Sequence, residues 1–168
     1  MLLLCGFEIM LRESITIEFA AVSDATAIGA LSQEYIEYGL GWSYTPRRIR
    51  SLISDGAKNV MVARDGGKLV GFGIMTYREE NANLDLLAVK IRYRRSGIGT
   101  QIVEWLEEVA TTAGIQNVFV QVRETNHSAI EFYRKLSFYA IDEQAGYYRG
   151  QETAVIMCKA IRPIFNAT

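Results

Sequence analysis

The sequence predicts one mixed α/β domain, and three observations lead to that class. The chain has 168 residues, a length that suits a single domain. Hydrophobic residues make up 49% of it, enough to bury a sizeable core. Short β-like runs and longer runs with helical spacing follow one another in the order β-α-α-β-β-β-α-β-α-β-β. We expect the domain to span 13–162, preceded by an extension of unknown role at 1–12.

The first third of the chain reads as a strand followed by two helices. Residues 15–19 alternate and are β-branched, which is typical of a strand. Ser23 and Asp24 offer a helix N-cap, and apolar residues at helical spacing follow as far as Tyr38. Pro46 suits the first turn of a second, shorter helix that ends near residue 53.

A hairpin and a buried strand follow. The apolar runs 59–63 and 69–75 are joined by Asp65-Gly66-Gly67, a strong hairpin signal. Residues 84–89 are almost wholly apolar and predict a buried central strand.

The second half alternates helices and strands again. Residues 98–113 carry an apolar face at helical spacing and end at Gly114. A strand at 118–122 precedes a second helix at 126–136. Two closing strands are expected at 138–142 and 153–158. We expect a loop containing Gly146, Tyr147 and Tyr148 to join them.

Composition excludes several function classes. Lys and Arg number 18 against 19 Asp and Glu, so the charge of −1 favours neither nucleic acid nor an anionic membrane as a partner. No apolar run approaches the length of a membrane span. With two cysteines at opposite ends and one histidine, His127, neither a disulfide framework nor the usual zinc site is expected. Two free thiols suit a cytoplasmic protein.

The segment between the buried strand and the long helix carries the chemistry. A helix N-terminus presents unpaired N–H groups and favours an anion. Two glycines let phosphate oxygens approach the backbone, and two arginines add donors. The segment consists of Arg94, Arg95, Ser96, Gly97, Ile98, Gly99 and Thr100. It is neither the dinucleotide fingerprint nor a Walker loop. The residues alone suit either a pyrophosphate site or an ordinary strand-to-helix turn.

Two motifs together resemble the GNAT N-acetyltransferase superfamily. Arg94-x-x-Gly97-x-Gly99 is similar to its acetyl-coenzyme A pyrophosphate motif. The run from Asn126 to Phe138 is similar to its next motif, N-x-x-A-x-x-F-Y-x-x-x-G-F, except that Ser137 replaces the usual glycine. The resemblance covers roughly residues 15–159. We expect Ser137 to be tolerated if the helix ends without a left-handed residue.

The resemblance implies a mixed, mostly antiparallel sheet in which two central strands splay apart, with acetyl-CoA in the gap as acyl donor. The backbone of Leu87, Ala88 and Val89 would pair with the pantetheine arm, and residues 94–100 would hold the pyrophosphate. Asn126 would contact the pantetheine or stabilise its loop. Tyr133 would lie beside the sulfur.

The resemblance also implies which residues take part in catalysis. Tyr133 would protonate the leaving thiolate, and the Val89 N–H would polarise the thioester carbonyl. From the residues alone, the apolar helix face favours Tyr133 as a core aromatic. The ribosomal-protein alanine N-acetyltransferase branch, which the sequence resembles most, has a glutamate base where this chain has Gln121. Asp85, which interrupts an apolar strand, is the leading base. Its alternatives are Glu124, Glu34, a water chain, or Asp85 as a solvent-facing or paired carboxylate.

The acceptor should bind opposite the cofactor, among aromatic residues that suit a peptide or a small amine. These candidates are Tyr35, Trp42, Tyr147 and Tyr148. The same aromatics also suit a packed surface or a homodimer contact. The predicted function is acetyl transfer from acetyl-CoA to a primary amine, of a protein N-terminus or of a small molecule. The alternative is a non-catalytic acyl-CoA sensor.

Overall fold

A computed structural model describes residues 15–161 of the chain. The predicted extension at 1–12 lies outside these residues, as does Cys5. Cys158 is buried and its thiol is free. Within residues 15–161, no helix is both long and apolar enough to cross a membrane.

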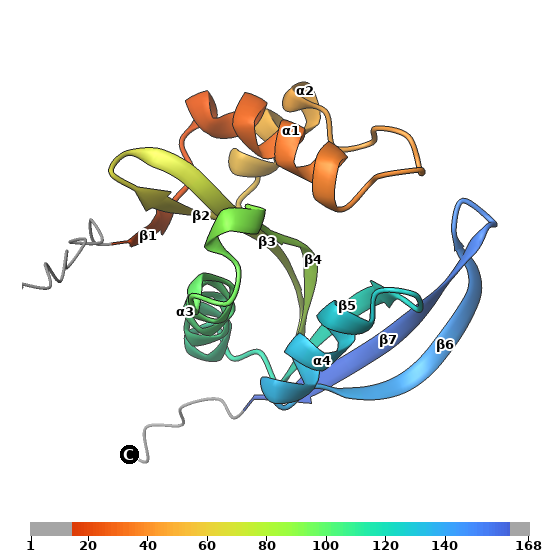
Figure 1. Ribbon diagram of the computed structural model, residues 1–168. Helices are drawn as coiled ribbons and strands as arrows, with labels where there is room; N and C mark the ends of the chain where they lie inside the picture. The colour runs from red at the N-terminus through yellow and green to blue at the C-terminus, as the bar shows by residue number, and fades with distance from the viewer. Residues whose placement is uncertain (1–14, 162–168) are drawn as a thin grey trace, which may run out of the picture.

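One seven-stranded sheet organises the described residues, with the strand order β1-β2-β3-β4-β5-β7-β6 (Figure 1). Every neighbouring pair is antiparallel except β4 and β5, which are parallel. The predicted mixed, mostly antiparallel α/β class is therefore confirmed. The strands are β1 (Thr16–Phe19), β2 (Lys58–Asp65), β3 (Lys68–Arg78), β4 (Asn81–Val89), β5 (Asn117–Arg123), β6 (Tyr139–Tyr148) and β7 (Glu152–Ala160).

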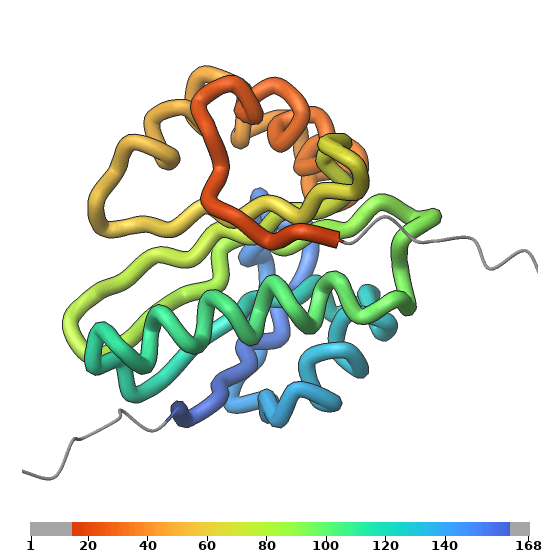
Figure 2. Tube along the Cα trace, turned by 90° about the vertical axis from the view of Figure 1, so that its left-hand side faces the viewer, coloured from red at the N-terminus to blue at the C-terminus, as the bar shows by residue number. Residues whose placement is uncertain are grey.

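Helices cover both faces of the sheet. The helices α1 (Ala25–Tyr35) and α2 (Pro46–Ile53) lie on one face, and α3 (Ile98–Thr112) lies along the other, as Figures 1 and 2 show. The helix α4 (His127–Lys135) packs beside β5 and β7 on the α3 side. Two buried clusters result: Ile28 and Phe72 belong to the one under α1, and Ile102 and Leu106 to the one under α3. Short 3₁₀ turns, η1 (Val22–Asp24) and η2 (Ile91–Tyr93), precede α1 and α3.

The parallel pair in the middle of the sheet opens along its length. The strands β4 and β5 pair only from Asn81–Asn117 to Leu84–Val120. Beyond Leu84, β4 stays paired with β3, and beyond Val120, β5 stays paired with β7. The expected splay is present, and it divides the sheet into two halves with a gap between them.

Two element boundaries differ from the expectation. The first helix ends at Tyr35 rather than at Tyr38, because the buried Glu37 carboxylate accepts N–H groups from Ser43 and Tyr44 at 2.7 and 3.1 Å and folds the following loop back. The expected loop around Tyr147 and Tyr148 was wrong: β6 continues through Tyr148. A bulge between Gln144 and Tyr148 changes the register, which breaks the alternation that the sequence pattern relies on.

The end of α4 corrects the expectation for Ser137. The N–H of Phe138 donates to the Tyr133 carbonyl and the N–H of Ser137 to the Arg134 carbonyl, both at 3.0 Å, which is a Schellman ending. Ser137 occupies its left-handed position, with φ of +70°. A serine there carries a steric cost that glycine avoids.

We therefore expect Ser137→Gly to raise the free energy of unfolding by about 0.5–1 kcal/mol, after the entropy cost of glycine is subtracted. Urea denaturation measures this. The matched control is Gly114→Ser: Gly114 ends α3 with the same two hydrogen bonds and φ of +83°, so that change should destabilise by a similar amount. Equal stability of Ser137→Gly and the original chain would contradict the strain argument.

Candidate active-site cleft

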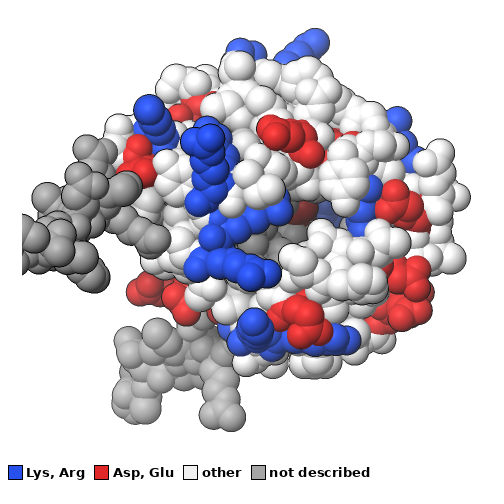
Figure 3. All heavy atoms as spheres, viewed as in Figure 1, with Lys and Arg blue, Asp and Glu red and all other residues white. Residues whose placement is uncertain are grey.

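A cleft lies where β4 and β5 separate. Its walls come from the carboxyl-terminal halves of both strands, the end of α1, the start of α4, and β6. Figure 3 shows it as a hollow in the molecular surface. The residues that line it are Tyr35, Ile36, Tyr38, Leu84, Asp85, Leu86, Leu87, Val120, Gln121, Val122, Arg123, Asn126, Ala129, Tyr133 and Tyr148.

The opened edge of β4 presents backbone groups to this cleft. The Lys90 N–H donates to the Val70 carbonyl of β3 at 2.8 Å. Because N–H directions alternate along a strand, the N–H groups of Leu87 and Val89 point away from β3, toward the gap. The Ala88 N–H points to β3. Of the three residues predicted to pair with an extended ligand, two therefore offer an N–H group to it.

The loop from η2 to α3 lies beside the cleft: none of residues 94–100 lines it, but Arg94 lies over the ring of Tyr35, which does. Gly97 is the N-cap of α3 with φ of +85°, a conformation that favours glycine. A Cβ on Gly99 would lie 3.3 Å from the Phe132 ring of α4, so only a minimal residue fits closely there. The Ser96 hydroxyl donates to the Tyr93 carbonyl and fixes the turn. Together these features leave the first N–H groups of α3, including those of Ile98 and Thr100, facing outward.

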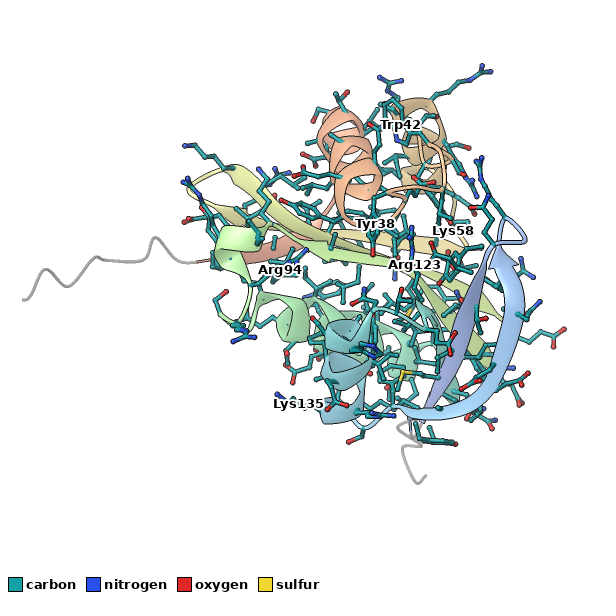
Figure 4. All side chains as sticks on the ribbon, turned by 45° about the vertical axis from the view of Figure 1, so that its right-hand side comes forward. Tyr38, Trp42, Lys58, Arg94, Arg123 and Lys135 are labelled. Carbon is teal, nitrogen blue, oxygen red and sulfur yellow. The ribbon has the colours of Figure 1, made fainter. Side chains whose placement is uncertain are left out.

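The two arginines of the loop differ in position. The Arg94 guanidinium donates to the Val89 carbonyl at 3.1 Å and lies over the Tyr35 ring, 5.0 Å from its centroid. It therefore bridges the mouth of the cleft, on the side opposite Arg123 in Figure 4. Arg95 is exposed, with φ of +60°. A group of basic side chains beside the hollow is visible in Figure 3. The helix N-terminus and this positive charge can hold a pyrophosphate.

Asn126 and Tyr133 form the α4 wall. The Asn126 Oδ1 accepts the Ala129 N–H at 3.1 Å and caps α4, so this side chain stabilises its own helix. Tyr133 is only 6% exposed, and its ring packs edge-to-face on Phe132 and Phe138. Burial and the neighbouring Tyr148 raise the pKa of Tyr133 well above the ordinary tyrosine value. Its hydroxyl stays protonated and can donate a hydrogen bond.

Asp85 lies half-buried at the floor of the cleft. Its Oδ1 accepts from Asn83 Nδ2 at 2.7 Å and its Oδ2 accepts from the Thr76 hydroxyl. Asn83 Oδ1 in turn accepts from Gln121 Nε2 at 2.8 Å. The structure thus joins the predicted base to the glutamine that replaces the expected glutamate.

The predicted acceptor aromatics are only partly brought together. Tyr35 and Tyr148 line the cleft. Trp42 lies outside it, and its indole N–H donates to the Gly29 and Tyr44 carbonyls. Tyr147 is 43% exposed and packs edge-to-face on Tyr148, with ring centroids 4.9 Å apart. Tyr147 does not itself line the cleft; burial and the negative charge of Asp85 raise its pKa.

Arg123 has a role that sequence reasoning did not assign. It is 6% exposed, and its guanidinium donates to the Ile36 and Tyr38 carbonyls at 2.7 and 2.8 Å and pairs with Glu152 at 3.2 Å. It also lies over the Tyr38 ring, 4.0 Å from the centroid. Arg123 thereby fastens the end of α1 to β5 across the opened sheet. In the sequence, Val122-Arg123-x-x-Asn126 is part of the resemblance to the ribosomal-protein alanine N-acetyltransferase branch, but nothing in it predicts these contacts.

The profile of the acetyltransferase (GNAT) family matches residues 27–138 of the chain. This span includes both the glycine loop and the α4 wall of the cleft. The chain belongs to the GNAT family.

Two curated GNAT proteins show how far the likeness extends. The [ribosomal protein bS18]-alanine N-acetyltransferase of Escherichia coli (strain K12) is 32% identical over 98 residues, which are 56% of this chain and 66% of that protein. The match therefore spans just under two thirds of that relative. An N-alpha-acetyltransferase of Saccharolobus solfataricus is 32% identical over 76 residues, 45% of this chain and 46% of that protein.

A solved GNAT structure agrees with the whole fold. The crystal structure of the ribosomal-protein-S18-alanine N-acetyltransferase from Escherichia coli superposes with a TM-score of 0.78 at 25% identity. The superposition covers 92% of this chain and 99% of that one. The fold predicted from the two motifs is the GNAT fold.

Proposed function

We propose that the protein is an N-acetyltransferase that moves the acetyl group of acetyl-CoA to a primary amine. The observation that carries this proposal is the opened sheet: the Leu87 and Val89 N–H groups of β4 point into the gap, and the loop that starts α3 lies beside it, with Arg94 bonded to the Val89 carbonyl. A thioester with a pantetheine arm and a pyrophosphate has the chemistry for that arrangement: amide groups that can pair with a strand edge and an anion that suits a helix N-terminus. The acceptor is the N-terminal amine of a polypeptide or a small primary amine. A reducing cytoplasm suits the free thiol of Cys158.

In the proposed reaction, the acceptor nitrogen forms a bond to the acetyl carbon while the carbon–sulfur bond breaks. The Val89 N–H stabilises the negative charge on the carbonyl oxygen. Asp85 takes the proton that the amine loses. The Tyr133 hydroxyl donates a hydrogen bond to the departing thiolate. Because burial raises the pKa of Tyr133, this hydroxyl acts as a hydrogen-bond donor more than as an acid.

Isothermal titration with CoA and acetyl-CoA, followed by thiol-release assays over amines and N-terminal peptides, tests the proposal. Binding of both cofactors and turnover of at least one amine are expected. Absence of binding would overturn it. Binding without turnover on any amine would favour an acyl-CoA sensor, the candidate that Gln121 at the usual base position supports.

Replacement of Asp85 by asparagine should lower kcat/KM by about 10²–10⁴-fold, because the proton acceptor is lost while the shape is kept. Steady-state rates with a series of amines and N-terminal peptides measure this loss. A variant that keeps the original kcat/KM would remove Asp85 from the role.

Replacement of Tyr133 by phenylalanine should lower kcat about 10²-fold and leave the KM for acetyl-CoA unchanged, because the lost hydrogen bond forms mainly as the thiolate leaves. Both limbs of the pH profile should stay in place, since the raised pKa keeps Tyr133 protonated. Tyr77→Phe is the matched control: Tyr77 is another largely buried tyrosine, bonded to Asn59 outside the cleft. An unchanged kcat in Tyr133→Phe would contradict the assignment.

A further inference from the structure

We propose that Gln121 binds the acceptor: its side-chain carbonyl oxygen accepts a hydrogen bond from the acceptor nitrogen and makes the site selective for amines that carry a second N–H. This rests on the proposed function and names a part of the same site. Gln121 replaces the glutamate expected from the resemblance, so the inference concerns what this chain does differently.

A directional chain of hydrogen bonds fixes how the Gln121 amide lies. The Lys58 ammonium has only donors, and it donates to the Thr76 oxygen at 2.6 Å, so the Thr76 hydroxyl proton points to Asp85. An ionised carboxylate has only acceptors, so Asn83 must turn its NH₂ group toward Asp85. The Asn83 oxygen then faces Gln121.

The hydrogen bond from Gln121 to Asn83 determines which atom of the Gln121 amide remains available to a ligand. Since the Asn83 oxygen accepts, Gln121 must present its NH₂ group to it, at 2.8 Å. The Gln121 Oε1 is left without a partner among residues 15–161, and the half-buried side chain lines the cleft. The amide orientation is therefore set by charges at the far end of the network, Lys58 and Asp85.

The position of Gln121 in the sheet places its side chain across the fork from Asp85, the proposed base. Leu84 and Val120 form the last pair of β4 and β5, so Asp85 and Gln121 are the first residues on either side of the fork. One nitrogen between them can donate one N–H to each oxygen. A neutral primary amine has two N–H groups and keeps its lone pair for attack. A neutral secondary amine has one, and leaves one oxygen unsatisfied.

The same series of hydrogen bonds predicts that a glutamate at position 121 does not act as a base. A carboxylate at position 121 would face the Asn83 oxygen, two acceptors in contact. Relieving that contact requires either protonation of the new carboxyl or rotation of Asn83 away from Asp85. Gln121→Glu should therefore weaken acceptor binding instead of raising the rate.

The experiment measures binding and does not depend on finding the natural acceptor. Two conjugates are used, and in both an acetyl bridge joins the CoA sulfur to the α-nitrogen of alaninamide. In the first conjugate this nitrogen keeps its N–H. In the N-methyl conjugate a methyl group replaces that hydrogen. Isothermal titration of the original chain should show the N–H conjugate binding about tenfold tighter than the N-methyl one. In Gln121→Leu that ratio should fall clearly below tenfold, because Asp85 alone remains to accept the N–H, while affinity for CoA alone stays within about twofold.

The matched control is Gln116→Leu, an exposed glutamine before β5 and outside the cleft, which should keep the tenfold ratio. Gln121→Glu should also lower the ratio. A preference that stays at about tenfold in Gln121→Leu or Gln121→Glu would overturn the inference. So would an original chain that binds CoA but does not distinguish the conjugates, and in that case the proposed function would stand. Failure to bind CoA at all would overturn the proposed function itself.

Discussion

Gly97→Val is expected to weaken the binding of CoA and acetyl-CoA at least about 100-fold. Gly97 starts α3 in the left-handed region, with φ of +85°, and its missing side chain leaves the first N–H groups of the helix accessible. A valine there would cover those groups and strain the turn. Loss of several charge-assisted hydrogen bonds to a pyrophosphate accounts for an effect of this size. Isothermal titration with CoA measures it.

The other end of the same helix supplies the control. Gly114 has φ of +83° and open space around it, so Gly114→Val should cost a similar amount of stability, about 1–2 kcal/mol. It follows the C-terminal end of α3, opposite the end that faces the proposed pyrophosphate, and should leave the affinity for CoA unchanged. Equal affinity for CoA in Gly97→Val and the original chain would show that the glycine loop does not bind the cofactor.

Arg123→Ala is expected to lower the free energy of unfolding by about 3–5 kcal/mol, a large share of the stability of a domain this size. The change removes the donor for the Ile36 and Tyr38 carbonyls and leaves the Glu152 carboxylate unpaired. It also removes the packing of the guanidinium on Tyr38. Urea denaturation followed by circular dichroism measures the loss.

Two comparisons separate this buried contact from arginine in general. Arg134→Ala breaks the exposed ion pair with Glu131 and should cost less than about 0.5 kcal/mol. Arg123→Lys keeps the charge but cannot reach both carbonyls and Glu152 at once, so it should recover only part of the loss. If Arg123→Ala is as mild as Arg134→Ala, Arg123 does not fasten α1 to the sheet.

The regular elements could be predicted because their signals are local. Gly66 and Gly67 fixed the hairpin between β2 and β3, and the observed φ values of +53° and +84° are those that such a turn requires. Pro46 marked the first residue of α2 correctly. The apolar spacing of α3 sets which face is buried, and Gly114 ends the helix one residue after its C-cap.

The end of β6 and the partners of the site residues depend on contacts between residues that are distant in the sequence. Strand β6 is exposed along most of its length, so no alternation of apolar and polar residues marks where it ends. Arg123 and the Ile36 carbonyl are 87 residues apart, and nothing local predicts their contact. The partners of Arg94 and Gln121 were likewise invisible, because a side chain's direction follows from the packing around it. The catalytic and binding roles of the cleft residues stay predictions.

The opened middle of the sheet also bears on how the protein avoids aggregation. Unpaired strand edges invite strands from other chains, and proteins usually shield the two outer ones. Here the Leu87 and Val89 N–H groups form a third edge inside the sheet. The end of α1, tied down by Arg123, and the start of α4 both line the cleft beside it and restrict the room for an extended segment of a neighbouring molecule. The cell can thus keep a backbone edge open for a small ligand without exposing a template for fibrils.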